Sequence, residues 1–195
     1  MRAAVIVAHP NPDAYCHALA RAAVSGLSAA GHEVDLVDLA ASGFRAAMSP
    51  DERRAYHGDS PILDDEIAGH ARLAQSVDTL VFVYPTWWGG LPAILKGWLD
   101  RVLVPGVGFV FSDDGKVRPG LTNVRRIIGI STYGSPKSYV RVMTDSGRRT
   151  LTRTLRVSCG PKTSTRWFGL YALDGTDEAE RRAFADRIER EMASL

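Results

Sequence analysis

Apolar residues follow two main patterns along this chain of 195 residues. Some form short runs, and others recur at helical spacing over longer stretches. Short runs of valine, isoleucine and leucine between polar residues are typical of strands that are buried on both faces. These runs predict strands at residues 2–8, 79–84, 125–131 and 165–173, and the alternation of apolar and polar residues at 32–39 predicts a further strand. Strands that alternate with helices, without an internal repeat, predict one α/β domain over residues 1–195 with an open parallel sheet.

Boundary residues indicate where the helices between these strands begin and end. The first helix has Asn11 as its expected N-cap, Pro12 at its first position and Gly31 just past its end. Further helices are predicted after Ser49-Pro50, at 64–77, from 91 onwards, at 139–157, and from 174–176 with Thr176 as the cap. A long glycine-rich connection at 104–123 separates the third and fourth strands.

Composition and charge exclude several classes of protein. The chain is 45% hydrophobic and 24% charged, with a net charge of +2 and acidic residues spread among the basic ones, so neither disorder nor a nucleic-acid partner is expected. No apolar stretch approaches the length of a membrane span. Cys16 and Cys159 form no C-x-x-C pair and the histidines have no ligand spacing, which predicts reduced thiols, a cytoplasmic protein and no metal site.

Ligands of open parallel sheets bind beyond the carboxyl ends of the strands, where three chemically rich loops are expected, at 9–17, 85–91 and 131–139. The first loop leads into a helix whose amino end presents free N–H groups and a positive dipole, which suits a phosphate. His9 would add a donor or a positive charge there. The simpler interpretation is that Asn11-Pro12 only starts a helix and that His9 is an ordinary histidine at a strand end.

The middle loop contains two adjacent tryptophans and two glycines. Gly89 allows close backbone approach, main-chain amides are free to donate, and Trp87 and Trp88 offer flat apolar walls, so the loop suits a planar heterocycle with a polar edge. In the alternative interpretation Trp88 packs into the core or a dimer interface. Trp98 lies on the apolar face of the following helix and is assigned to the core, and Gly97 beside it marks close packing.

The third loop offers hydroxyl groups and Tyr139, which can donate a hydrogen bond to a developing anion or move a proton, or else serve only as a packing residue. Other chemistries are not favoured. No G-x-G-x-x-G follows the first strand and no P-loop occurs. The stretch GISTY has Tyr133 in place of the second glycine of a nucleophile elbow, which speaks against a serine hydrolase.

Together, AHPNPD at 8–13, YPTWWGGLPAILKGWLDRVL at 84–103, and STYGS at 131–135 followed by Tyr139 resemble the NAD(P)H:quinone oxidoreductase family of flavodoxin-like proteins. The resemblance covers essentially the whole chain. It implies a flavodoxin-like three-layer sandwich with a five-stranded parallel sheet in the order 2-1-3-4-5. It also implies a homodimer, with FAD or FMN bound at the carboxyl edge of the sheet.

The resemblance also implies site residues. Around the flavin phosphate or pyrophosphate it places His9, Asp13, Tyr15, Cys16 and Ala18. Along the isoalloxazine ring it places Pro85, Thr86, Trp87, Trp88 and Gly89, and at the pyrimidine side Ser131, Thr132, Tyr133 and Gly134. Tyr139 matches the catalytic tyrosine that stabilises charge on the reduced flavin, and Arg181 matches an arginine near the adenosine of FAD in some members, which favours FAD weakly.

The chain departs from the family pattern at three positions. Ala14 and Cys16 stand where the family often has serine and asparagine, and His17 is a candidate to replace a missing phosphate contact. The family's partner histidine, six residues after the tyrosine, falls on Asp145. An ionised carboxylate cannot donate a proton, which speaks against a tyrosine–histidine relay.

The activity that the resemblance implies is hydride transfer from NAD(P)H through bound flavin to a quinone or similar flat acceptor. One alternative is a flavin-binding ancillary subunit of a potassium efflux system. Another is a reductase for one particular quinone, nitro or azo compound.

Overall fold

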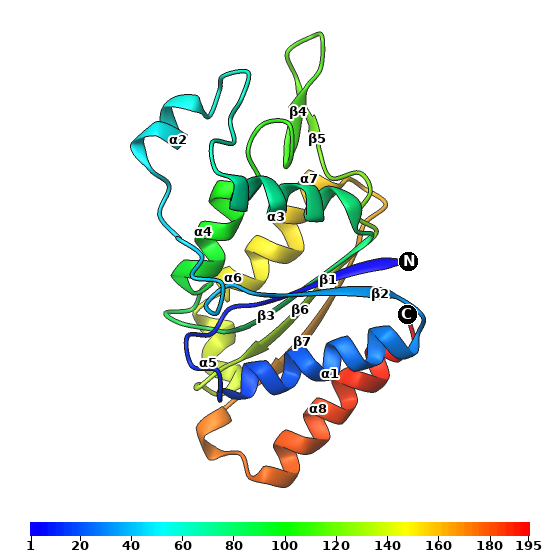
Figure 1. Cartoon of the computed structure of the whole chain (residues 1–195). Coiled ribbons are helices and arrows are strands. Elements are labelled where there is room, and N and C mark those ends of the chain that lie inside the picture. Colours follow the sequence, from blue (N-terminus) through cyan, green and yellow to red (C-terminus); the bar gives the residue numbers. More distant parts are fainter.

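A five-stranded parallel sheet forms the centre of the protein in the computed structural model, which describes residues 1–195 (Figure 1). Its strands lie in the order β2-β1-β3-β6-β7. Their bounds are β1 Arg2–Val7, β2 Glu33–Asp38, β3 Thr79–Pro85, β6 Arg126–Thr132 and β7 Ser164–Leu170. Numbered within this sheet alone, the order is the expected 2-1-3-4-5, so the predicted fold class is confirmed.

Side chains that alternate along the central strand β1 build two cores, one on each face of the sheet. Ala3, Val5 and Val7 face one core, while Ala4 and Ile6 face the other. Helices α1 Tyr15–Ala29 and α8 Glu178–Ala193 cover the first face, and α3 Asp65–Ser76 and α4 Ala93–Val102 lie on the second (Figure 1). From Ala3 to Val7 the strand is apolar, because neither face meets water there.

The first helix begins later than expected. Asn11 does not cap it: its Oδ1 accepts a hydrogen bond of 2.9 Å from the Asp13 N–H, which forms a turn ahead of the helix. Ala14 is the N-cap residue and offers no side-chain cap. The predicted end is confirmed, because Gly31 follows α1 with a φ of +80°, a conformation that glycine adopts without strain.

The N-cap of the last helix is Asp177, one position after the predicted Thr176. Asp177 accepts from the Glu180 N–H at 2.8 Å, and the Glu180 carboxylate accepts from the Asp177 N–H at 3.0 Å, which completes a capping box. Thr176 instead donates its hydroxyl to the Leu173 carbonyl at 2.7 Å. A short 3₁₀ turn, η2 Leu173–Gly175, occupies the end of the predicted fifth strand.

The prediction of a single helix at 139–157 is wrong. The structure has α5 Lys137–Val142, α6 Ser146–Arg149, a π-helical turn η1 Thr150–Leu155 and α7 Arg156–Cys159. The break lies at Thr144 and Asp145, which have φ values of +67° and +38°. A right-handed helix cannot pass through left-handed residues, and the Asp145 side chain starts α6 by accepting from the Arg148 N–H at 3.2 Å.

Two further elements lie outside the central layers. The connection at 104–123 contains a small antiparallel sheet, β4 Phe109–Phe111 with β5 Val117–Pro119, which projects from the body of the fold (Figure 1). The short helix α2 Pro50–Ala55 begins at the expected Ser49-Pro50. Glu52 of α2 forms a buried ion pair with Arg101 of α4, and the distance from Glu52 Oε1 to Arg101 Nη2 is 2.6 Å.

The interpretations of Gly97 and Trp98 are both confirmed. Trp98 is fully buried, and a Cβ atom at Gly97 would collide with the backbone of Ala46. Cys16 and Cys159 are buried free thiols. No helix has both the length and the apolar character needed to cross a bilayer, and no group of three or more histidine, cysteine or acidic residues is arranged to hold a metal ion.

Candidate functional site

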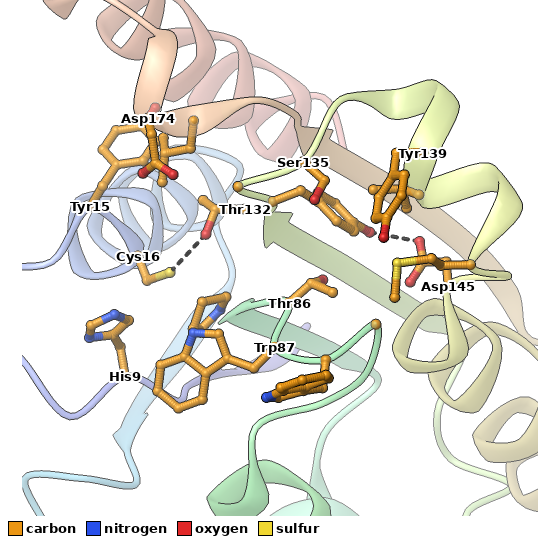
Figure 2. Close-up of a pocket in the computed structure, with 18 of the residues that line it drawn as sticks. His9, Tyr15, Cys16, Thr86, Trp87, Thr132, Ser135, Tyr139, Asp145 and Asp174 are labelled. Carbon is orange, nitrogen blue, oxygen red and sulfur yellow. Dashed lines mark hydrogen bonds between the residues drawn. The ribbon is translucent and has the colours of Figure 1, made fainter.

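A cavity of about 870 Å³ lies at the carboxyl ends of β1, β3 and β6, where all three predicted loops meet (Figure 2). Its walls are formed by His9, Ala14, Tyr15, Cys16, Pro85, Thr86, Trp87, Trp88, Gly89, Thr132, Tyr133, Gly134, Ser135, Tyr139, Val140, Met143, Asp145, Leu173 and Asp174. Figure 2 shows His9 and Cys16 on one side and Tyr139 with Asp145 on the opposite side.

Four of the residues that sequence reasoning assigned to the site do not line this cavity: Asp13, Ala18, Ser131 and Arg181. Ser131 lies behind the wall, fully buried, with its hydroxyl 2.8 Å from that of Thr86. The guanidinium of Arg181 donates to the hydroxyl and the carbonyl of Thr176. His17 is not part of the lining either, and its Nε2 lies 3.3 Å from the His9 carbonyl oxygen.

The amino end of α1 forms one side of the cavity. The main-chain N–H groups of Tyr15 and Cys16 make no hydrogen bond within the chain, and Ala14 offers no side-chain cap. Such free amides together with the helix dipole favour an anion. Burial lowers the pKa of His9 below its ordinary 6.5, so at neutral pH this ring offers a hydrogen bond and no positive charge.

The tryptophan loop is a tight turn closed by two hydrogen bonds, from the Trp87 N–H to the Gly90 carbonyl at 3.2 Å and from the Gly90 N–H to the Trp87 carbonyl at 2.9 Å. Trp88 and Gly89 are the central residues, with φ values of +50° and +69°. A left-handed conformation costs a non-glycine residue about 1–2 kcal/mol. Trp88 is fully exposed, so it does not pack into the core of this chain.

The tryptophan loop also presents free main-chain donors. The N–H groups of Trp88 and Gly89 make no hydrogen bond within the chain. Trp87 is about half exposed, and its ring lies edge-on to that of His9 at 5.9 Å between centroids. The loop therefore combines apolar faces with unpaired amides at the mouth of the cavity.

The third loop supplies a further pair of free donors and an exposed phenol. The N–H groups of Gly134 and Ser135 are unpaired within the chain. Tyr139 is 56% exposed and its hydroxyl forms no hydrogen bond in the chain, so this residue neither caps a helix nor packs in the core. This phenol is free to contact a ligand in the cavity.

The amino end of α6 joins the second and third loops. Ser146 donates its N–H at 2.9 Å and its hydroxyl at 2.8 Å to the same acceptor, the Gly89 carbonyl oxygen. Gly147 packs against the same loop, because a Cβ atom there would lie 3.1 Å from the Leu91 nitrogen. The break in the predicted helix thus positions the tryptophan turn.

Burial keeps three titratable side chains of the cavity wall, Tyr15, Cys16 and Tyr133, in their neutral forms. Burial, and then a hydrogen bond to Asp145, raise the pKa of Tyr133, so it remains a phenol that donates. Burial raises the pKa of the Cys16 thiol to about 11 and that of Tyr15 to about 12. Neither the thiolate nor a phenolate is therefore available at neutral pH.

Sequence reasoning missed several lining residues for two reasons. Val140, Met143 and Asp145 belong to the segment predicted as one helix from residue 139, although the polar run Thr-Asp-Ser-Gly at 144–147 is a helix-break signal. Ser135 lies in the predicted third loop, but the resemblance gives it no contact with the flavin. Leu173 and Asp174 were assigned to the end of the fifth strand and the start of the last helix. The glycine at position 175 was the available signal for a turn there.

Free amides on three sides of a cavity with apolar walls suit a flat aromatic ligand with polar edges and an anionic tail. One pair of donors lies in the tryptophan loop, a second in the third loop, and the third at the N-terminus of α1. The Cys16 thiol is not ionised at neutral pH and is therefore a poor nucleophile.

Comparison with known proteins supports the assignment of the fold. The chain matches the sequence model of a family described as flavodoxin-like fold over residues 1–193. It is 30% identical over 153 residues to rat NAD(P)H dehydrogenase [quinone] 1, an alignment that covers 71% of this chain and 56% of the rat protein. The chain thus spans little more than half the length of that relative.

Two solved structures share the fold over the full length of the chain. The NAD(P)H:quinone oxidoreductase from Methanothermobacter marburgensis superposes with a TM-score of 0.85 at 22% identity, covering 100% of this chain and 98% of that one. An FMN-dependent NADH-azoreductase from Bacillus anthracis, in complex with FMN, superposes with a TM-score of 0.76 at 15% identity, covering 99% and 97%. By its sequence match and its strand order, this chain belongs to the flavodoxin-like fold family.

Proposed function

We propose that this protein is a flavin-dependent oxidoreductase that transfers hydride from NAD(P)H to a quinone, an azo compound or a similar flat acceptor. The names of its relatives support this activity, since they include a quinone-reducing NAD(P)H dehydrogenase and an FMN-dependent azoreductase. The observation that carries the proposal is the set of unpaired main-chain donors around the cavity.

The residues present fit a flavin. The free N–H groups of Trp88 and Gly89, with those of Gly134 and Ser135, match the polar edge of the isoalloxazine ring. The amino end of α1 matches a phosphate group. We place His9, Tyr15, Cys16, Pro85, Thr86, Trp87, Trp88, Gly89, Thr132, Tyr133 and Gly134 around the flavin, with Ser131 supporting Thr86 from behind.

The protein contributes binding and positioning, while a bound flavin supplies a centre that accepts and returns two electrons as hydride. Tyr139 is the proposed catalytic residue, since its phenol is exposed, lines the cavity and is free to donate towards developing negative charge. Asp145 does not serve as its relay partner in this proposal, because the carboxylate already accepts from Tyr133.

The geometry does not favour FAD over FMN. The case for FAD rested on Arg181, whose guanidinium is engaged by Thr176 and does not line the cavity. Asp13 and Ala18 also lie outside the lining, so the proposal assigns them no contact with the ring. The homodimer stays a prediction, and sedimentation at about twice the chain mass of 21.2 kDa is its test.

The decisive experiment is a flavin-binding and turnover assay. We expect purified protein, alone or mixed with FAD or FMN, to show the absorbance band of a bound flavin at about 450 nm. Under anaerobic conditions NADH or NADPH should bleach the band, and menadione should restore it. Mass spectrometry of the released cofactor then distinguishes FAD from FMN. A protein that gains no such band with either flavin contradicts the proposal.

A further inference from the structure

A second groove, of about 570 Å³, adjoins the cavity and is lined largely by basic residues. Its floor includes the edge strand β7, and its opposite wall is the broken helical segment α5–α7. The cations along that wall are Lys137, Arg141, Arg148, Arg149, Arg153 and Arg156.

None of these six side chains has a carboxylate within ion-pair distance. Arg166, the seventh cation of the groove, is paired with Glu191. The single lining carboxylate, that of Asp145, already accepts hydrogen bonds from Tyr133 and from the Arg148 N–H. In a chain with a net charge of only +2, this gathering of unpaired cations makes a local positive field that favours an anionic ligand.

Two aromatic rings in the groove, those of Trp167 and Tyr171, lie next to its cationic side chains. The Arg148 guanidinium carbon lies 5.7 Å from the centre of the Trp167 ring, and Lys137 Nζ lies 5.8 Å from that of Tyr171. Such stacking orients the cationic groups and leaves their N–H donors free. Arginine forks bind the oxygen atoms of a phosphate bidentately.

The groove and the cavity share two lining residues, Val140 and Asp145. A molecule that places a flat ring in the cavity therefore reaches the groove with a chain that passes the Val140–Asp145 wall. NADPH has this form, with a nicotinamide ring at one end and a pyrophosphate and a 2′-phosphate towards the other.

We propose that this groove binds the phosphates of the reductant and that its unpaired arginines select the 2′-phosphate, so that NADPH is preferred to NADH. The inference rests on the proposed function, because it requires the nicotinamide to bind in the cavity. Both dinucleotides carry the pyrophosphate, and only NADPH adds a further dianionic group, which gains most from several unpaired guanidinium groups.

The first test measures binding without turnover. Isothermal titration with adenosine 2′,5′-bisphosphate and with 5′-AMP should show tighter binding of the bisphosphate by about tenfold, the value of one charge-assisted hydrogen bond. The Arg149→Glu/Arg153→Glu variant should lose that difference, and Arg149→Gln/Arg153→Gln should lose most of it. The control Arg21→Glu/Arg190→Glu has the same charge change on exposed positions of α1 and α8 and should bind as the wild type does.

The second test uses the flavin-loaded enzyme. In the Arg149→Gln/Arg153→Gln variant we expect KM for NADPH to rise about tenfold more than KM for NADH, while kcat changes little. Equal binding of the bisphosphate and 5′-AMP, or equal loss in the control variant, would overturn the inference. A protein that binds no flavin would overturn the proposed function, while the bisphosphate titration would still report on the groove.

Discussion

The hydroxyl of Tyr133 donates a hydrogen bond of 2.8 Å to Oδ2 of Asp145, and both side chains are buried. Asp145 also caps α6 with its other oxygen, which accepts from the Arg148 N–H. The resemblance to quinone reductases puts a histidine at this position, as a partner of the catalytic tyrosine. In this chain the residue is instead an acceptor that joins the end of β6 to the start of α6.

Replacing Tyr133 by phenylalanine should lower the free energy of unfolding by about 1.5–3 kcal/mol, because a buried carboxylate loses its charged hydrogen bond. Urea denaturation measures the change. Tyr139→Phe is the matched control, since the Tyr139 hydroxyl has no partner in the chain, and its unfolding free energy should stay within about 0.5 kcal/mol of the wild type. Equal stability of the two variants would contradict this account of Asp145.

The same Tyr139→Phe variant should lose activity. If the phenol donates to developing negative charge, its removal should lower kcat with NADPH and menadione at least about tenfold, without weakening flavin binding. Stopped-flow bleaching of the flavin band measures the reductive half-reaction directly. Tyr56→Phe, far from the cavity, controls for the loss of a phenol, and unchanged kcat in Tyr139→Phe would remove Tyr139 from the mechanism.

Trp88→Gly should separate stability from function. The left-handed conformation at φ +50° is strained for tryptophan and ordinary for glycine, and the exposed ring has no packing to lose, so we expect stability to fall by less than about 0.5 kcal/mol. Flavin affinity should fall all the same, as read by titration at the flavin band. By contrast, Trp98→Ala should cost about 3–5 kcal/mol, because it empties a fully buried site.

The Glu52–Arg101 ion pair predicts acid sensitivity. Burial opposes ionisation of Glu52, but the hydrogen bonds from the Ser49 N–H and the Arg101 guanidinium outweigh it and hold the pKa of Glu52 below its ordinary 4.5. A lowered folded-state pKa stabilises the fold above the unfolded value, and that contribution is lost as pH falls from 4.5 through the folded value.

Glu52→Gln should therefore remove part of the loss of stability between about pH 5 and pH 3. At neutral pH the same variant should cost up to about 3–5 kcal/mol, because the buried guanidinium then keeps only Asp64, at 3.4 Å, as a charged partner. Urea midpoints across this pH range supply the measurement, and Asp51→Asn, an exposed neighbour, is the control. An identical pH dependence in Glu52→Gln and the wild type would refute the assignment.

Both thiols should be inert in the folded protein. Burial raises the pKa of Cys16 to about 11 and that of Cys159 to about 12, so at about pH 8 almost no thiolate forms. We expect no reaction with a disulfide reagent in native buffer and reaction of both thiols in urea. Fast labelling of Cys16 in the native protein would show that the cavity wall opens.

The strands and the edge on which the site lies follow from the sequence alone. The inner strands β1, β3 and β6 appear as mainly apolar runs, as at 79–84, because burial on both faces disfavours polar side chains. The edge strand β2 appears instead as an alternation of apolar and polar residues, because it is only partly buried. Parallel order then places the loops after 8, 84 and 131 at one edge, where the cavity lies. Two predicted helix starts differ from the structure, although Asn11 and Thr176 are residue types that favour the N-cap position. Each side chain instead forms a local hydrogen bond outside the helix, Asn11 with the Asp13 N–H and Thr176 with the Leu173 carbonyl.

Only the tertiary structure decided where the segment after Tyr139 breaks, and that break shapes both the cavity and the basic groove. The left-handed residues Thr144 and Asp145 interrupt a run whose local preference is helical. Asp145 is held there by Tyr133, and Ser146 by Gly89, which lies 57 residues earlier in the chain. Helical periodicity reports only on neighbours within a turn or two, so a conformation fixed by distant partners leaves no periodic signal in the sequence.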